Sequence, residues 1–144
     1  MESVATTVSS PDGFIAINKP VGARSTDVVR AVRRVTRTRR VGHCGTLDPL
    51  AAGVVPVAIG RATRLSAYVL CAPKTYLAAI LFGVRTTTDD LEGAIVGSPC
   101  PAPDTAGVLR VLPAFVGAIR QRPPATSAVR SDGRRAYERV RSGE

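Results

Sequence analysis

The chain has 144 residues, of which 44% are hydrophobic and 22% charged, and this composition indicates a folded domain rather than a disordered segment. Its net charge is +9, and 18 of its 20 basic residues are arginine. Because guanidinium groups bind phosphate in a forked geometry, this charge favours a nucleic acid partner; a solvated basic face without a ligand is the alternative. No apolar run approaches the length of a membrane span. The three cysteines and single histidine are too scattered for a zinc site or a disulfide framework, so we expect a cytoplasmic protein.

Apolar residues of the N-terminal half recur at spacings typical of both strands and helices. Val28, Val32 and Val35 follow the helical spacing, and Ser25 or Thr26 would cap that helix. The expected elements are, in chain order, a flexible tail over residues 1–10, a strand over 13–18, a helix that begins near Ser25, a strand over 54–59 and a helix over 61–70.

Two of the expected strands contain residues that need a separate interpretation. Pro56 has no backbone N–H to donate, so the strand over 54–59 is expected at a sheet edge or a bulge. Residues 75–82 are rich in apolar and aromatic side chains and predict a central strand. Tyr76, near its start, is either a core aromatic or a base-stacking platform, and we favour the core because apolar strands contain tyrosines routinely.

The C-terminal half is predicted to consist of short elements joined by polar turns. Its acidic cluster, Asp89, Asp90 and Glu92, offers oxygen ligands for magnesium, but threonine and aspartate before a glycine are also ordinary turn chemistry, which we favour. The other expected elements are a strand over 94–96, a helix from Asp104 as its cap to about Phe115, a strand over 127–130 leading to a turn at 131–133, and a basic helix over 134–142.

The stretch from Val41 to Gly53 has the highest density of conformationally special residues in the chain. It holds the only histidine and three glycines, and Pro49 restricts Asp48 to extended backbone angles. Because leucines stand on both sides of Asp48, we expect its carboxylate in a poorly hydrated setting, presented to a partner as a nucleophile or a base. An Asp-Pro turn whose aspartate only hydrogen-bonds nearby backbone is the alternative.

One segment resembles the signature of the TruB-type pseudouridine synthases: residues 42–53, Gly-His-Cys-Gly-Thr-Leu-Asp-Pro-Leu-Ala-Ala-Gly. Four further segments resemble the family in the same order, namely 18–22, 74–76, 86–93 and 127–137. The order of elements predicts an α+β fold with a mixed sheet flanked by helices. The resemblance implies the pseudouridine synthase fold, mainly antiparallel and incomplete, over residues 11–144.

The resemblance implies isomerisation of uridine to pseudouridine in the T-arm of tRNA, at tRNA position 55, without a cofactor or a metal ion. Such an enzyme flips a uridine out of the RNA, breaks its glycosidic bond and rejoins the base through carbon. The resemblance implies that Asp48 takes the position of the catalytic aspartate, that His43 helps to open the T-loop, and that Tyr76 stacks on the target base. Arg40 and Arg64 are expected to bind the RNA. The residues expected to support the active-site loop are Lys19, Pro20, Gly42, Gly45 and Pro49.

Members of this family continue into further strands, which carry an arginine paired with the catalytic aspartate, and usually into a small C-terminal RNA-binding domain. We therefore expect this chain to be the N-terminal portion of the catalytic domain, monomeric and without the C-terminal domain. One alternative is a fragment that binds structured RNA but catalyses nothing. Another, which we favour less, is a guide-RNA-dependent synthase that modifies ribosomal RNA.

Overall fold

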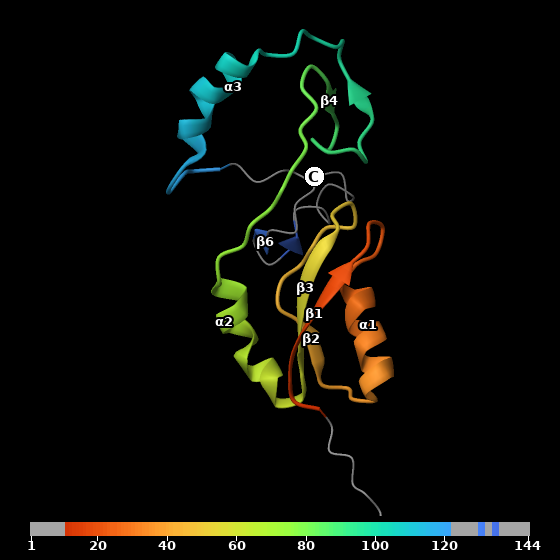
Figure 1. The fold of residues 1–144 in the computed structure, drawn as a ribbon. Helices are drawn as coiled ribbons and strands as arrows, with labels where there is room; N and C mark the ends of the chain where they lie inside the picture. Colours follow the sequence, from red (N-terminus) through yellow and green to blue (C-terminus); the bar gives the residue numbers. More distant parts are fainter. Residues whose placement is uncertain (1–10, 122–129, 132–133, 136–144) are drawn as a thin grey trace, which may run out of the picture. The chain divides into compact units, whose positions relative to one another are not determined.

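The computed structural model describes residues 11–121, 130–131 and 134–135 (Figure 1). These residues belong to two compact units, 1–76 and 77–144. The tail expected over residues 1–10 lies outside the described residues, as do most of the strand expected over 127–130 and most of the helix expected over 134–142.

A three-stranded antiparallel sheet forms the centre of the first unit. Its strands are β1 (Gly13–Lys19), β2 (Val41–His43) and β3 (Gly53–Ile59), in the order β1-β3-β2. β1 and β3 pair along their whole length, from Gly13 opposite Ile59 to Lys19 opposite Gly53. The strands predicted over 13–18 and 54–59 are confirmed. The sequence does not predict β2, because three residues are too few to show an alternating pattern.

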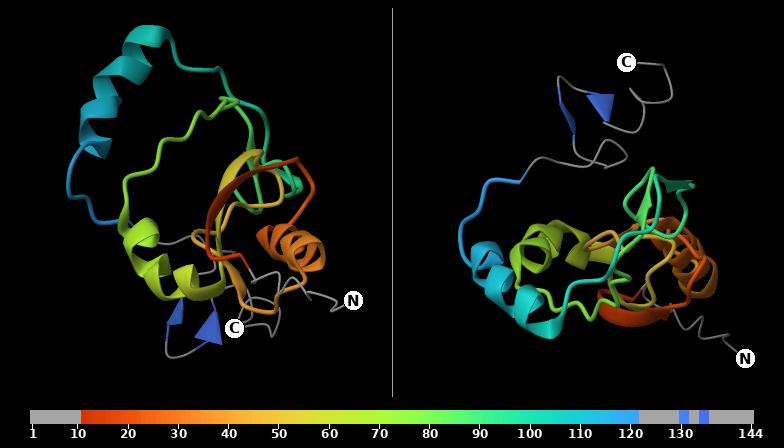
Figure 2. Two further views of the ribbon diagram at one scale, coloured as in Figure 1. Left: turned by 60° about the horizontal axis from the view of Figure 1, so that its bottom comes forward. Right: turned by 90° about the horizontal axis from the view of Figure 1, so that it is seen from above.

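Different helices cover the two faces of this sheet (Figures 1 and 2). One face packs against α1 (Ser25–Thr36), and the other packs against the 3₁₀-helix η1 (Gly60–Leu65) and the helix α2 (Ser66–Cys71). Successive side chains of β3 alternate between these faces, as the pleat of a strand requires. The buried cluster on the α1 face is Val28, Val29, Val32, Val41, Val55, Val57 and Ile59. The buried cluster on the other face is Cys44, Ala58 and Ala62.

The start of α1 differs from the prediction. Its N-cap is Arg24 and not Ser25 or Thr26, and the carboxylate of Asp27 accepts a hydrogen bond from the Arg24 backbone N–H at 2.9 Å. This bond satisfies a backbone donor at the helix N-terminus, so neither hydroxyl is needed as a cap. The hydroxyl of Ser25 bonds the backbone of Leu47 instead.

β3 is the central strand although it contains Pro56, so the expected edge position is wrong. The Pro56 carbonyl oxygen accepts a hydrogen bond from the Cys44 N–H at 2.7 Å, next to the last β2 pair, His43 with Val57. In a strand the nitrogen and the carbonyl oxygen of one residue point to the same side, so the nitrogen of Pro56 faces away from β1. The missing N–H therefore removes no hydrogen bond from the β1–β3 pairing.

The second unit contains short elements. A hairpin pairs β4 (Arg85–Thr86) with β5 (Ile95–Val96), which confirms a brief strand near 94–96. α3 (Thr105–Val111) is capped by Asp104, as predicted, and continues as the 3₁₀-helix η2 (Leu112–Phe115). β6 (Arg130–Ser131) pairs with β7 (Arg134–Arg135), so the expected last helix does not begin at residue 134. All strand pairs among the described residues are antiparallel, and the α+β class is confirmed.

The central strand predicted over residues 75–82 is absent, and this segment has no regular secondary structure. Leu77, Ile80 and Leu81 are exposed, and Tyr76 is 66% exposed, so the expected place of Tyr76 in the core is wrong. A strand forms only when a neighbour completes its hydrogen bonds, and no described segment pairs with residues 75–82. High β propensity alone does not supply that neighbour.

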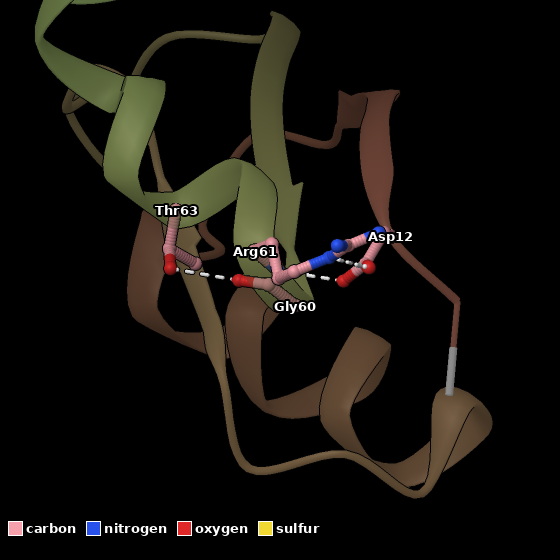
Figure 3. Close-up of polar contacts among 4 residues, drawn as sticks. All are labelled: Asp12, Gly60, Arg61 and Thr63. Carbon is pink, nitrogen blue, oxygen red and sulfur yellow. Dashed lines mark hydrogen bonds and ion pairs between the residues drawn. The ribbon is translucent and has the colours of Figure 1, made fainter. Parts of the chain in front are cut away.

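Asp12 joins the start of β1 to the start of η1 (Figure 3). Its carboxylate accepts hydrogen bonds from the Arg61 backbone N–H at 2.6 Å and from the Arg61 Nε at 2.5 Å. Gly60 has a φ of +61°, and a Cβ atom there would collide with the Asp12 carboxylate, so this contact requires glycine. The backbone hydrogen bond from Arg61, and then its side-chain hydrogen bond, lower the pKa of Asp12 below the usual value of 3.8.

We predict that Asp12→Asn lowers the melting temperature at pH 7 and that its difference from wild type shrinks in acid. Because the pKa of Asp12 is lowered on folding, its carboxylate stabilises the fold above pH 3.8 and loses this effect as the pH falls through the lowered folded value. Circular dichroism melts between pH 7 and about pH 2 measure the difference. Asp48→Asn is the matched control and is expected to melt like wild type at pH 7. A difference for Asp12→Asn that stays constant with pH would contradict the assignment.

Candidate active site

Asp48 lies in the loop that connects β2 to β3. Its carbonyl oxygen accepts a hydrogen bond from the Ala51 N–H at 3.0 Å, which closes a turn with Pro49 at the second position. The Asp48 side chain is exposed, as are Pro49 and Leu50, so the expected poorly hydrated setting is wrong. Among the described residues the carboxylate accepts no hydrogen bond and makes no ion pair. The Asp-Pro turn therefore forms through the backbone and leaves the carboxylate available.

The ammonium group of Lys19 ties this loop to the turn that follows β1. Lys19 is fully buried, and its Nζ donates to the carbonyl oxygens of Pro20 at 3.0 Å, Ala23 at 2.8 Å and Pro49 at 3.5 Å. The Gly22 N–H donates to the same Pro49 oxygen at 2.7 Å. A buried charge needs polar partners, and here, among the described residues, carbonyl dipoles take the place of a carboxylate. These bonds bring together three residues predicted to support the loop, Lys19, Pro20 and Pro49.

Helix α1 holds the residue that precedes Asp48. The Ser25 hydroxyl donates to the Leu47 carbonyl oxygen at 3.1 Å and accepts from the Leu47 N–H at 2.9 Å. The Leu47 side chain packs against the buried cluster on the α1 face. From the sequence, Ser25 is predicted only as a possible helix cap, because no local pattern indicates a partner 22 residues away.

The remaining predicted loop residues lie at the end of β2 and just after it. His43 pairs with Val57 at the end of β2, and its Nδ1 is buried without a hydrogen-bond partner among the described residues. Gly42 lies in the middle of the same strand. Gly45 has a φ of +142°, and the Lys74 Cε lies 3.6 Å from the position that a Cβ atom would take there. In the part of the chain that the structure describes, no hydrogen bond joins His43 to Asp48 or Tyr76.

The first unit carries most of the positive charge. Residues 11–76 contain 11 basic residues and only three acidic ones. Two of the acidic residues are already paired, Asp27 with Arg30 at 3.0 Å and Asp12 with Arg61 at 2.5 Å. Both arginines predicted to bind RNA, Arg40 and Arg64, are exposed. The exposed arginines of residues 11–76 that have no acidic partner among the described residues are Arg24, Arg33, Arg34, Arg37, Arg39, Arg40 and Arg64.

The acidic cluster of the second unit is a turn. The Asp90 carboxylate accepts hydrogen bonds from the Thr88 hydroxyl at 2.6 Å and the Glu92 N–H at 2.8 Å, and these bonds, that of Thr88 first, lower the Asp90 pKa. The described residues contain no group of three or more histidine, cysteine or acidic side chains that could hold a metal ion. They also contain no helix that is both long enough and apolar enough to cross a bilayer. The hydrogen bonds of Asp90 confirm the turn interpretation of this acidic cluster.

Comparison with known proteins shows the family. Residues 33–144 match the TruB family pseudouridylate synthase (N terminal domain), and the chain belongs to this family. It is 50% identical over 133 residues to tRNA pseudouridine synthase B of a Nostoc species and 48% identical to that of Corynebacterium aurimucosum. Each match covers 92% of this chain but only 45% of the relative, so the chain spans less than half of their length.

A solved structure shows the fold. The crystal structure of a Cbf5-Nop10-Gar1 complex matches 82% of this chain and 31% of the matched chain, with a TM-score of 0.54 and 28% identity. The resemblance to TruB-type pseudouridine synthases and the fold expected from it are therefore confirmed.

We predict that Lys19→Met lowers the free energy of unfolding by about 2–3 kcal/mol, because three backbone carbonyl oxygens, those of Pro20, Ala23 and Pro49, lose a charged donor. Lys74→Met is the matched control: Lys74 is the only other lysine of the chain, it is exposed, and we expect a change of less than about 0.5 kcal/mol. Urea denaturation followed by circular dichroism measures both changes. Equal losses in the two variants would show that the Lys19 contacts do not stabilise the fold.

Proposed function

We propose that this member of the TruB family isomerises uridine to pseudouridine in the T-arm of tRNA, with Asp48 as the catalytic residue. The observation that carries the proposal is that the Asp48 carboxylate is exposed while both of its neighbours, Leu47 and Pro49, are hydrogen-bonded to residues 19–25. A fixed backbone with a free carboxylate suits a group that has to meet a nucleotide flipped out of its stack.

The proposed reaction rearranges bonds within one nucleotide. The glycosidic bond between N1 and C1′ breaks, and a bond between C5 and C1′ forms after the base has rotated. The C5 hydrogen leaves as a proton and N1 gains a proton, so the product is an isomer and no oxidant or reductant is consumed. Asp48 attacks either the sugar or the base. The exposed Tyr76 stacks on the flipped base, which returns about 1–3 kcal/mol against a flipping cost of a few kcal/mol.

Two observations support tRNA as the substrate. The relatives that are 48–50% identical are named tRNA pseudouridine synthase B, whereas the Cbf5 structure is 28% identical. Exposed arginines also suit an RNA that is recognised through its backbone and splayed bases. In this proposal Arg40 and Arg64 contact phosphates, and His43 helps to displace the target nucleotide.

RNA binding without catalysis is the second candidate function. It is favoured by one observation, that no arginine or lysine among the described residues forms an ion pair with Asp48. Such a cation would form a charge-assisted hydrogen bond with the carboxylate and fix its orientation. The two candidates predict the same RNA affinity and differ only in product formation.

Asp48→Asn is predicted to lower the rate of pseudouridine formation by about 10³-fold or more, because the amide cannot act as a nucleophile or a base. The assay is the release of tritium from uridine C5 of unmodified tRNA, and the RNA dissociation constant is expected to stay within about threefold. Asp89→Asn is the control, since it removes an exposed carboxylate of the second unit. An unchanged rate in Asp48→Asn excludes Asp48 as catalytic residue; a wild-type chain that binds tRNA without tritium release supports the second candidate.

Arg40→Gln is predicted to weaken tRNA binding and to reduce the slope of log K against log salt by about 0.7–0.9, the effect of one lost phosphate contact. Arg30→Gln is the matched control, because Arg30 is also exposed but already pairs with Asp27 at 3.0 Å. Its effect on the slope is expected to be smaller. Fluorescence anisotropy at several salt concentrations measures both slopes. A flat salt dependence of the wild-type chain would contradict phosphate binding by these arginines.

A further inference from the structure

We infer that Ser25 is a positioning residue that fixes the orientation of Asp48, an inference that rests on the proposed function. Ser25 is the first residue of α1, and it lies 22 positions before Leu47 in the chain. It touches neither the Asp48 side chain nor any group that the proposed reaction uses. Its effect on Asp48 is therefore transmitted through the backbone of Leu47.

The Ser25 hydroxyl satisfies both backbone groups of Leu47. A hydroxyl can donate one hydrogen bond and accept others, and here it donates to the Leu47 carbonyl oxygen at 3.1 Å while it accepts from the Leu47 N–H at 2.9 Å. A residue of a neighbouring strand would make the same two bonds with its backbone. Ser25 is only 4% exposed, so water has little access to replace these bonds if the hydroxyl is removed.

These bonds fix the peptide plane that leads into Asp48. The Leu47 carbonyl and the Asp48 nitrogen belong to one planar unit, so a hydrogen bond to the carbonyl also orients the nitrogen. The next peptide plane is held by the bond from the Ala51 N–H to the Asp48 carbonyl oxygen. The plane after that is held by Lys19 and Gly22, which both donate to the Pro49 carbonyl oxygen. The backbone of Asp48 is thus fixed on both sides.

This fixed backbone matters because nothing else among the described residues orients Asp48. Its carboxylate is exposed and makes no hydrogen bond or ion pair there, so its position before substrate binds depends on the backbone from which it projects. A reacting group misplaced by about 1 Å can cost about 10²-fold in rate. α1 is a rigid base for this purpose, because its valines pack into the core of the sheet.

The test compares Ser25→Ala, which removes the hydroxyl, with Ser25→Thr, which keeps it. Thr26→Ala is the matched control, since Thr26 is the next residue and its hydroxyl is exposed. For Ser25→Ala we expect kcat for pseudouridine formation to fall by about 10- to 100-fold while KM changes by less than about threefold. Ser25→Thr restores kcat to within about threefold of wild type, and Thr26→Ala leaves it unchanged.

Amide hydrogen exchange of the same variants tests the hydrogen bonds between Ser25 and Leu47 independently of activity. The Leu47 amide is expected to exchange about tenfold faster in Ser25→Ala and at the wild-type rate in Thr26→Ala. If Ser25→Ala does not fold, Ser25→Thr carries the test: it must keep both the slow Leu47 exchange and kcat, and loss of either overturns the inference.

The possible failures are distinguishable. An active wild-type chain whose kcat is unaffected by Ser25→Ala, or whose KM alone changes, overturns the positioning role of Ser25 and leaves the proposed function intact. An inactive wild-type chain overturns the proposed function and the catalytic role of Ser25 with it. If the Leu47 amide of a folded Ser25→Ala variant exchanges at the wild-type rate, the inferred role of the Ser25–Leu47 hydrogen bonds is overturned.

Discussion

The buried ammonium group of Lys19 is the constraint on which the candidate site depends. A charge taken out of water is destabilising unless polar groups surround it, and Lys19 finds carbonyl oxygens from the turn after β1 and from Pro49. The turn and the β2–β3 loop must therefore come together before this charge is satisfied. Because Lys19 also pairs with Gly53 in the sheet, the register of β1 on β3 determines where the Asp48 loop is held.

The Asp48 loop is fixed at its ends by the sheet and in its interior by residues 19–25. The pair His43 with Val57 and the bond from Cys44 to Pro56 close its ends. Hydrogen bonds to the backbones of Leu47 and Pro49 hold its interior. These contacts use backbone atoms and leave the carboxylate of Asp48 exposed. In the proposed function, these contacts preorganise Asp48 without burying its side chain.

The sequence pattern predicted the elements that depend on interactions between residues close together in the chain. Alternation located β1, a short apolar run located β3, and helical spacing located α1. Asp104 was predicted as a cap because its partner is three residues away. The failures involve distant partners. Whether the missing N–H of Pro56 costs a hydrogen bond between strands depends on where β2 ends. The partner of Ser25 depends on the tertiary fold. Residues 75–82 have the composition of a strand, but composition cannot provide the strand that would pair with them.

In the proposed recognition of RNA, charge acts at long range, whereas the geometry of the site acts only on contact. The excess of basic residues in the first unit attracts phosphate over about 10 Å at moderate salt, but a field of this range cannot select one uridine among its neighbours. Selection requires groups that touch the base, and the exposed Tyr76 and Asp48 are available for such contact. The two properties occur in one unit, so RNA attracted by the arginines meets the same unit that presents Asp48. In the proposed enzyme, affinity therefore depends on charge, whereas the choice of nucleotide depends on the groups that touch the base.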